Sequence, residues 1–277
     1  MKRNILKVKK GKPVVVKRKA TVRVARKLRV TTDAPQPRRN AAPRRIAKNA
    51  LGAYALEVLA RLKREYPDAH TELDYETPLQ LLEATILSAQ CTDKRVNMVT
   101  PLLFKTYPTA AALADADPEK LEEIIRSTGF FRNKTKSLIG LGKALVEQHD
   151  GEVPDSMDLL VKLPGVGRKT ANVVLGNAFH KNEGVVVDTH VARVSHRLGL
   201  TRETDPIKIE QDLMPLFPRE DWALLSHLLI FHGRRVCEAR KPKCEICVLN
   251  DICPSSTAIA GGGRREAGGG NRDAAGR

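Results

Sequence analysis

The chain has 277 residues, a net charge of +16 at pH 7 and 42% hydrophobic residues, so it can form one large or two ordinary domains with a sizeable core. No apolar run approaches the roughly 20 residues of a transmembrane helix, and the start lacks the apolar segment of a secretory signal. Residues 1–50 hold 18 Lys or Arg and one acid, whereas residues 51–254 hold 26 Lys or Arg and 29 acids. If residues 51–254 bind nucleic acid, their basic residues must therefore lie on one face.

The two ends of the chain differ from the rest in composition. Residues 1–49 are predicted to be a disordered basic arm, because Val alternates with Lys and Arg without the apolar mass of a core. Such an arm can add non-specific affinity for nucleic acid through counterion release. A solubilising extension, or a segment for organellar or nuclear targeting, is the alternative. Residues 255–277, rich in Gly and Arg, are predicted to be a disordered tail.

The body between these ends is predicted to be all-α, with short helices and short connections. Thr77-Pro78 and Asp117-Pro118 each combine a capping residue with a Pro at the first turn, which is a helix start signal. Val185-Val186-Val187 is β-branched but too short for a convincing strand. The expected helices cover residues 54–66, 77–89, 93–104, 117–127, 134–149, 157–163, 168–178, 188–198, 206–216 and 222–231.

The stretch Leu163-Pro164-Gly165-Val166-Gly167-Arg168-Lys169-Thr170-Ala171 joins two of these helices. Its glycines permit a tight turn and let a phosphate approach the backbone closely. Free backbone N–H groups at the N-terminus of the second helix form a ready anion site. The stretch therefore suggests a hairpin that holds nucleic-acid backbone. A plain turn between helices, with an exposed Lys169, is the alternative.

Lys169 and Asp188 stand 19 residues apart, one helix and one loop away, and both could face a single groove. A partly buried lysine with a lowered pKa is a nucleophile for a sugar carbon and forms a Schiff base. A nearby carboxylate can take its proton and stabilise a sugar cation. Asp188 is also a good N-cap for the helix that follows, and this structural role is compatible with the chemical one.

Four of the five cysteines are close together, with the spacing Cys237-x6-Cys244-x2-Cys247-x5-Cys253. In a chain without a secretion signal, such a cluster indicates metal binding rather than disulfides. One CxxC pair with two longer gaps favours a 4Fe–4S cluster over zinc, which usually takes two such pairs. Arg240, Lys241 and Lys243 lie between the ligands and are suited to phosphate contact, unless they only offset the thiolate charge.

A polar link, Leu87-Ser88-Ala89-Gln90-Cys91-Thr92-Asp93, separates two apolar helices. Gln90 at the helix end is placed to enter a duplex and fill the gap left by an extruded base. A polar surface turn is the alternative. Cys91 is expected to be a small core or surface residue, because its distance from the other four cysteines argues against ligation.

These motifs together resemble the endonuclease III branch of the helix–hairpin–helix DNA glycosylases. The resemblance covers residues 50–254 and rests on the polar link, the hairpin with Val185–Val191, and the cysteine loop, in the right order. It implies a six-helix domain over residues 72–182. It also implies a second helical domain from residues 50–71 and 183–254, which carries one 4Fe–4S cluster, with DNA in the cleft between them.

The resemblance implies a bifunctional DNA glycosylase and AP lyase of base excision repair. Such an enzyme removes oxidised pyrimidines through a lysine Schiff base and cuts the strand 3′ to the abasic site by β-elimination. The resemblance places the nucleophile on Lys169, the catalytic carboxylate on Asp188 and the residue that fills the vacated stack on Gln90. The expected cluster ligands are Cys237, Cys244, Cys247 and Cys253. The other expected DNA contacts are Leu163, Gly165, Val166, Gly167, Arg168, Arg240, Lys241 and Lys243.

The expected partner is double-stranded DNA with a damaged pyrimidine or an abasic site, bound by a monomer in the cytoplasm, on the bacterial nucleoid. The chain departs from the family pattern in its basic arm, its Gly/Arg end and Cys91. Two rival functions are a non-catalytic DNA-binding protein and a structural metal-loop module with a protein partner. The presence of both Lys169 and Asp188 argues against the first, and the hairpin argues against the second.

Overall fold

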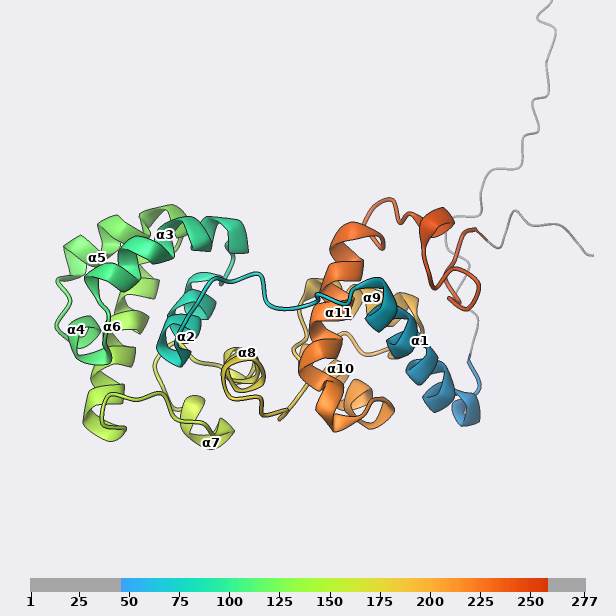
Figure 1. Ribbon diagram of the computed structural model, residues 1–277, viewed down its shortest axis with the longest axis horizontal. Coiled ribbons are helices and arrows are strands. Elements are labelled where there is room, and N and C mark those ends of the chain that lie inside the picture. Colours follow the sequence, from blue (N-terminus) through green and yellow to red (C-terminus); the bar gives the residue numbers. More distant parts are fainter. Residues whose placement is uncertain (1–45, 259–277) are drawn as a thin grey trace, which may run out of the picture. The chain divides into compact units, whose positions relative to one another are not determined.

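The structure is a computed structural model that describes residues 46–258. The predicted arm and tail lie outside these residues, except for positions 46–49 and 255–258. Within the described range the chain forms helices joined by loops and contains no strand (Figure 1). The all-α prediction is therefore confirmed. No described helix is both long and apolar enough to cross a bilayer.

The helices begin and end close to the predicted positions. They are α1 Leu51–Glu65, α2 Pro78–Leu87, α3 Asp93–Thr106, α4 Ala110–Ala114, α5 Pro118–Ile125, α6 Phe131–Gln148, α7 Met157–Leu160, α8 Arg168–Ala178, α9 Thr189–Arg197, α10 Pro206–Leu213 and α11 Trp222–Arg235. Short 3-10 helices add η1 Lys48–Ala50, η2 Arg126–Thr128, η3 Met214–Leu216, η4 Arg219–Asp221 and η5 Cys244–Ile246.

The capping residues act as the sequence predicts. The side chain of Thr77 accepts a hydrogen bond from the N–H of Gln80 at 3.2 Å, and Asp117 accepts one from Lys120 at 2.9 Å. Each such cap stabilises its helix by about 1 kcal/mol. Helix α4 was not predicted, because its five residues, all Ala or Leu, are too few to show helical periodicity.

The buried apolar residues form two clusters. The first cluster gathers side chains from α2 to α8, and the second gathers side chains from α1 and from α9 to α11. The chain passes between the clusters twice, between Ala69 and Leu73 and between Phe179 and Val185. Helix α8, which follows the glycine hairpin, packs against α2 in the first cluster and also contacts α11 (Figure 1). The hairpin therefore lies close to the boundary between the two clusters.

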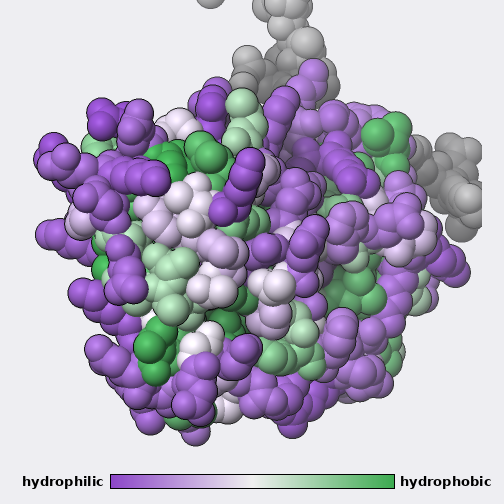
Figure 2. All heavy atoms as spheres, turned by 60° about the vertical axis from the view of Figure 1, so that its left-hand side comes forward, coloured by the Kyte–Doolittle hydropathy of each residue, from purple (hydrophilic) through white to green (hydrophobic). Residues whose placement is uncertain are grey.

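The surface shown in Figure 2 is mostly hydrophilic, in contrast to the two apolar clusters. On the face in Figure 2, hydrophilic side chains form most of the periphery and hydrophobic groups occur in small separate patches. Most large apolar side chains are instead buried, and Leu81, Leu103 and Leu141 are fully inaccessible to solvent. Burying a side chain of this size stabilises the fold by about 1.5–3 kcal/mol.

Candidate active site

The glycine hairpin is present and connects α7 to α8. Leu163 and Val166 point inward and are buried, and the N–H of Val166 donates to the carbonyl of Leu163 at 3.1 Å. Gly165 has φ +79°, and a Cβ there would lie 2.8 Å from the Cβ of Ser137 on α6. The turn therefore requires glycine at position 165 for its backbone and for close packing.

Gly167 differs from Gly165 in what surrounds it. It is the N-cap of α8 with φ −96°, and a Cβ there would meet no described atom within 4 Å. The first turn of α8 leaves backbone N–H groups without intrahelical acceptors. An anion from outside can approach these groups closely because Gly167 has no side chain.

Lys169 lies on this first turn of α8 and is exposed. The sequence left the burial of Lys169 open, and its role as the nucleophile stays a prediction. The neighbouring Arg168 turns toward α10, where its Nε and Nη2 donate to the carboxylate of Glu210 at 3.0 and 2.9 Å. This hydrogen bond raises the pKa of Arg168. Two of its N–H groups thus already have a partner, and its contact with DNA stays a prediction.

Asp188 caps α9, as the sequence predicts. One oxygen, Oδ1, accepts both hydrogen bonds, from the N–H of His190 at 2.7 Å and of Val191 at 2.8 Å. The charge of Asp188 also reaches Arg234 on α11. Burial lowers the pKa of Arg234, but its hydrogen bond to Asp93 and the charges of Asp93, Glu72 and Asp188 raise it overall.

Arg234 joins α11 to two other parts of the chain. Its Nη2 donates to Oδ2 of Asp93 at 2.8 Å, at the start of α3, and its Nη1 donates to Glu72 in the segment between α1 and α2. These ion pairs fix α11, which carries Arg234, against the first cluster.

Two loops present exposed side chains from a left-handed backbone. Gln90, after α2, has φ 54°, and Phe130, before α6, has φ 47° and is 64% exposed. Left-handed φ in a bulky residue is strained and is often found at functional sites. The two loops are tied together by Lys134, which is buried and donates through Nζ to the carbonyls of Leu87 at 2.7 Å and Thr128 at 2.9 Å. Burial lowers the pKa of this lysine.

Sequence reasoning found Gln90 but missed Phe130 and Lys134. The sequence signal for Phe130 was its place as an apolar residue directly after Gly129, between the end of one helical segment and the start of the next. The partners of Lys134 lie 47 and six residues away, so its role could not be read from local sequence.

The four cysteines of the C-terminal loop are brought together and line one cavity, with Arg197 and His232 among its other walls. Nη1 of Arg197 donates to Sγ of Cys237 at 3.3 Å, and the N–H of Leu249 donates to Sγ of Cys247 at 3.4 Å. Donors of this kind stabilise thiolate ligands. Burial raises the pKa of Cys253 to about 11, so ligation to a cation is needed to keep this thiol deprotonated at neutral pH.

The four thiols in this cavity are a ligand set that suits a 4Fe–4S cluster. Iron–sulfur clusters of this kind are held by four cysteine thiolates, and each cysteine binds a different iron. Cys91 lies apart from this loop and packs against the first cluster.

The basic residues of the loop have different surroundings. Arg197 holds the loop from α9 by donating to the carbonyls of Glu238 and Ala239, both at 2.7 Å. Arg240 and Lys241 are exposed on the fixed loop. Lys243 instead binds the carboxylate of Glu238 at 2.6 Å and the carbonyl of Arg235 at 3.1 Å. The DNA contacts predicted for these three residues stay predictions.

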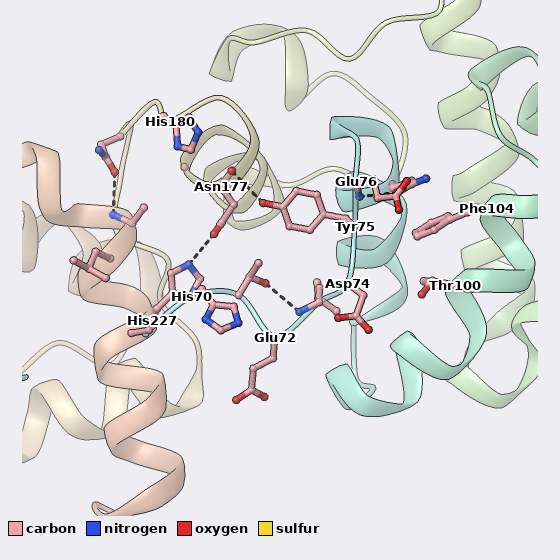
Figure 3. Close-up of a pocket in the computed structure, with 18 of the residues that line it drawn as sticks. His70, Glu72, Asp74, Tyr75, Glu76, Thr100, Phe104, Asn177, His180 and His227 are labelled. Carbon is pink, nitrogen blue, oxygen red and sulfur yellow. Dashed lines mark hydrogen bonds between the residues drawn. The ribbon is translucent and has the colours of Figure 1, made fainter. Parts of the chain in front are cut away.

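A large cavity of about 1090 Å³ lies at the other end of α8 (Figure 3). Asn177 lines it, with Nε2 of His227 2.9 Å from its Oδ1 and the hydroxyl of Tyr75 donating to its carbonyl at 3.1 Å. The wall also includes acidic residues such as Glu72 and Asp74, which disfavour phosphate. Lys169 lies eight residues before Asn177, about 12 Å along the helix axis, so this cavity is separate from the lysine.

Comparison with known proteins identifies the class to which this arrangement is similar. Residues 84–219 match the family described as "HhH-GPD superfamily base excision DNA repair protein". Residues 237–253 match the family described as "Iron-sulfur binding domain of endonuclease III". The second match spans all four cysteines of the loop.

Relatives match over nearly their whole length. Endonuclease III of Synechocystis is 60% identical over 74% of this chain and 93% of its own length. A solved non-covalent endonuclease III–DNA complex is 42% identical with a TM-score of 0.71, and covers 76% of this chain and 98% of its own. A trapped endonuclease III–DNA covalent intermediate has the same identity and TM-score over 78% of this chain and 99% of its own.

Proposed function

The chain belongs to the endonuclease III family of base-excision DNA repair proteins, and we propose that Lys169 and Asp188 carry out its reaction on oxidised pyrimidines in double-stranded DNA. Members of this family are bifunctional DNA glycosylases and AP lyases, and this chain is one of them. It binds DNA and carries a 4Fe–4S cluster.

The proposed reaction starts at the exposed amine of Lys169. The neutral amine attacks C1′ of the damaged nucleotide, the bond from C1′ to the base breaks, and the base leaves with a proton. The bond from C1′ to the ring oxygen O4′ then breaks and O4′ takes up a proton. The Schiff base that forms between C1′ and the lysine makes the 2′ proton acidic. Removal of this proton breaks the bond between C3′ and its oxygen and cuts the strand. The carboxylate of Asp188 stabilises the positive charge that develops on the sugar and accepts a proton from the lysine.

The proposed DNA contacts position the sugar for this attack. The protein backbone from Leu163 to Gly167 binds a phosphate of the DNA. Arg240 and Lys241, on the fixed cysteine loop, also contact the DNA backbone. The cluster bound by Cys237, Cys244, Cys247 and Cys253 shapes this loop. Gln90 and Phe130 enter the duplex where the damaged nucleotide leaves the stack. Extruding that nucleotide costs about a few kcal/mol.

One observation carries the proposal. Lys169 is exposed two residues after Gly167, on the first turn of α8, and nothing in the described protein requires Gly167 to lack a side chain. A turn that keeps free N–H groups open to an anion, directly beside an exposed lysine, is suited to hold a phosphate and attack the adjoining sugar.

The proposal extends to the whole chain. The first and second apolar clusters support two helical domains, residues 72–182 and residues 50–71 with 183–254. We propose that the protein acts as a monomer in the cytoplasm, on the nucleoid. The basic excess of residues 1–50 supports additional non-specific DNA affinity.

A nicking assay tests the proposed lesion class. The enzyme should cut duplexes that contain thymine glycol or an abasic site, leaving an unsaturated aldehyde on the 3′ end, and should leave an undamaged duplex intact. A duplex with 8-oxoguanine controls for purine lesions. Tight binding to abasic DNA without cleavage would support a non-catalytic DNA-binding protein instead.

A further inference from the structure

Glu210 on α10 is a buried carboxylate that binds α8 next to Lys169. Its side chain is 7% exposed, whereas the side chain of its partner Arg168 is 43% exposed. In addition to the two bonds from Arg168, Oε1 accepts a hydrogen bond from Nδ2 of Asn172 at 3.1 Å. One carboxylate thus holds the first two turns of α8 at two points. A buried charge of this kind is costly unless it is paired, and this one has three donors.

This contact joins the two apolar clusters. Ala171 and Val174 of α8 are buried in the first cluster, and Ile209 and Leu213 of α10 are buried in the second. Arg168 and Glu210 are 42 residues apart in sequence and meet across the boundary. Bidentate pairing fixes both the distance and the orientation of the guanidinium, which a single hydrogen bond does not.

Gly184 makes room for the same carboxylate. A Cβ at Gly184 would lie 1.8 Å from Oε1 of Glu210 and 2.7 Å from Nδ2 of Asn172. Gly184 is buried and directly precedes the segment Val185–Val187, which leads to Asp188. Glu210 therefore contacts the helix turn that carries Lys169 and the segment that positions Asp188.

We propose that Glu210 is a positioning residue for the reaction, because its carboxylate fixes the first turn of α8 relative to the segment that ends at Asp188. The proposal rests on the functions proposed above for Lys169 and Asp188. Misplacement of reacting groups by about 1 Å can slow a reaction about 100-fold. Loss of this contact should therefore reduce the rate of the chemical step more than it reduces DNA affinity.

Two substitutions test this role in the full-length enzyme. Glu210→Gln keeps the shape but places an amide N–H group opposite the donors of Arg168 or Asn172. Gly184→Ala adds a Cβ where Oε1 now lies and displaces the carboxylate. Glu203→Gln is the matched control, because Glu203 pairs only loosely with Lys208, at 3.9 Å, and both side chains are largely exposed. Excision of thymine glycol is measured under single-turnover conditions, and affinity is measured with duplex containing a non-cleavable abasic analogue.

The expected result is a fall in excision rate of about 30- to 100-fold in Glu210→Gln and Gly184→Ala, with affinity within threefold of wild type. The double variant should be no slower than the slower single variant, because both changes act on one carboxylate. Glu203→Gln should match wild type. Iron–sulfur absorbance and cooperative unfolding establish the folded fraction of each variant.

Three outcomes would overturn the proposal. They are rates within threefold of Glu203→Gln, equal losses of rate and affinity, and losses fully explained by a smaller folded fraction. Borohydride trapping of wild type and of Lys169→Gln on abasic DNA separates this question from the proposed function. If wild type is not trapped, or if Lys169→Gln still is, the proposed function fails whatever Glu210 does.

Discussion

Asp188 is the N-cap of α9 and the proposed catalytic carboxylate, and its two oxygens allow these roles to be separated. Oδ1 accepts both N-cap hydrogen bonds of α9, so the second oxygen is not needed for the cap. Asn is as good an N-cap as Asp, because its side-chain oxygen accepts the same bonds. Asp188→Asn should therefore fold like wild type while it lacks the negative charge that is proposed to stabilise the sugar cation.

For Asp188→Asn we expect an excision rate about 100- to 1000-fold below wild type, in line with the loss of one electrostatic stabiliser. Affinity for abasic DNA should stay within a few-fold. Single-turnover kinetics give the excision rate, and thermal unfolding of the same preparation gives the stability. A large fall in stability with an unchanged rate per folded molecule would show that Asp188 is only a cap.

At the scale of elements, the hairpin contains two glycines, and each position lacks a side chain for a different physical reason. Gly165 has a left-handed backbone and packs against Ser137, whereas a Cβ on Gly167 meets nothing within 4 Å. Gly165→Ala should therefore destabilise the protein by about 1–3 kcal/mol. Gly167→Ala should leave stability unchanged and weaken DNA binding about tenfold, because the methyl group blocks the approach of a phosphate.

Denaturant unfolding and DNA titration of both variants check this pair. Unchanged DNA affinity in Gly167→Ala would mean that the glycine serves only the turn. The iron–sulfur absorbance should be the same in both variants, because the cysteine loop does not contact the hairpin glycines.

At the scale of the whole molecule, His227 links α11 to α8 across the two clusters through Asn177. Burial, with a smaller effect of His70, lowers the pKa of His227 to about 4. An unfolded chain has a histidine pKa of about 6.5, so between pH 6.5 and 4 it binds more protons than the folded state. The free energy of unfolding should therefore fall by about 3 kcal/mol as the pH drops through this window.

Chemical denaturation of wild type and His227→Gln across this pH range measures the contribution of His227. The variant should lose that part of the pH dependence. His180→Asn is the control, because His180 is exposed and Asn tolerates its left-handed φ of 54°. Equal pH dependence in wild type and His227→Gln would contradict the assignment.

Whether the role of a residue can be predicted from the sequence depends on how far along the chain its partners lie. Thr77, Asp117 and Asp188 could be identified as caps because a cap acts within three residues of itself. The cysteine spacing likewise marked the metal loop within one short segment. Glu210 and Lys134 could not be found in this way, because burial and distant partners define them. The burial of Lys169 could not be predicted from its neighbours in sequence, and in the structure it is exposed on the first turn of α8.

The central claim is that Lys169 forms the covalent bond to DNA. Borohydride reduction of a reaction with abasic duplex should trap wild-type protein on the DNA as a stable adduct. Lys169→Gln should give no adduct, while its iron–sulfur absorbance and its affinity for the abasic duplex stay close to those of wild type. An adduct of undiminished yield with Lys169→Gln would contradict the claim.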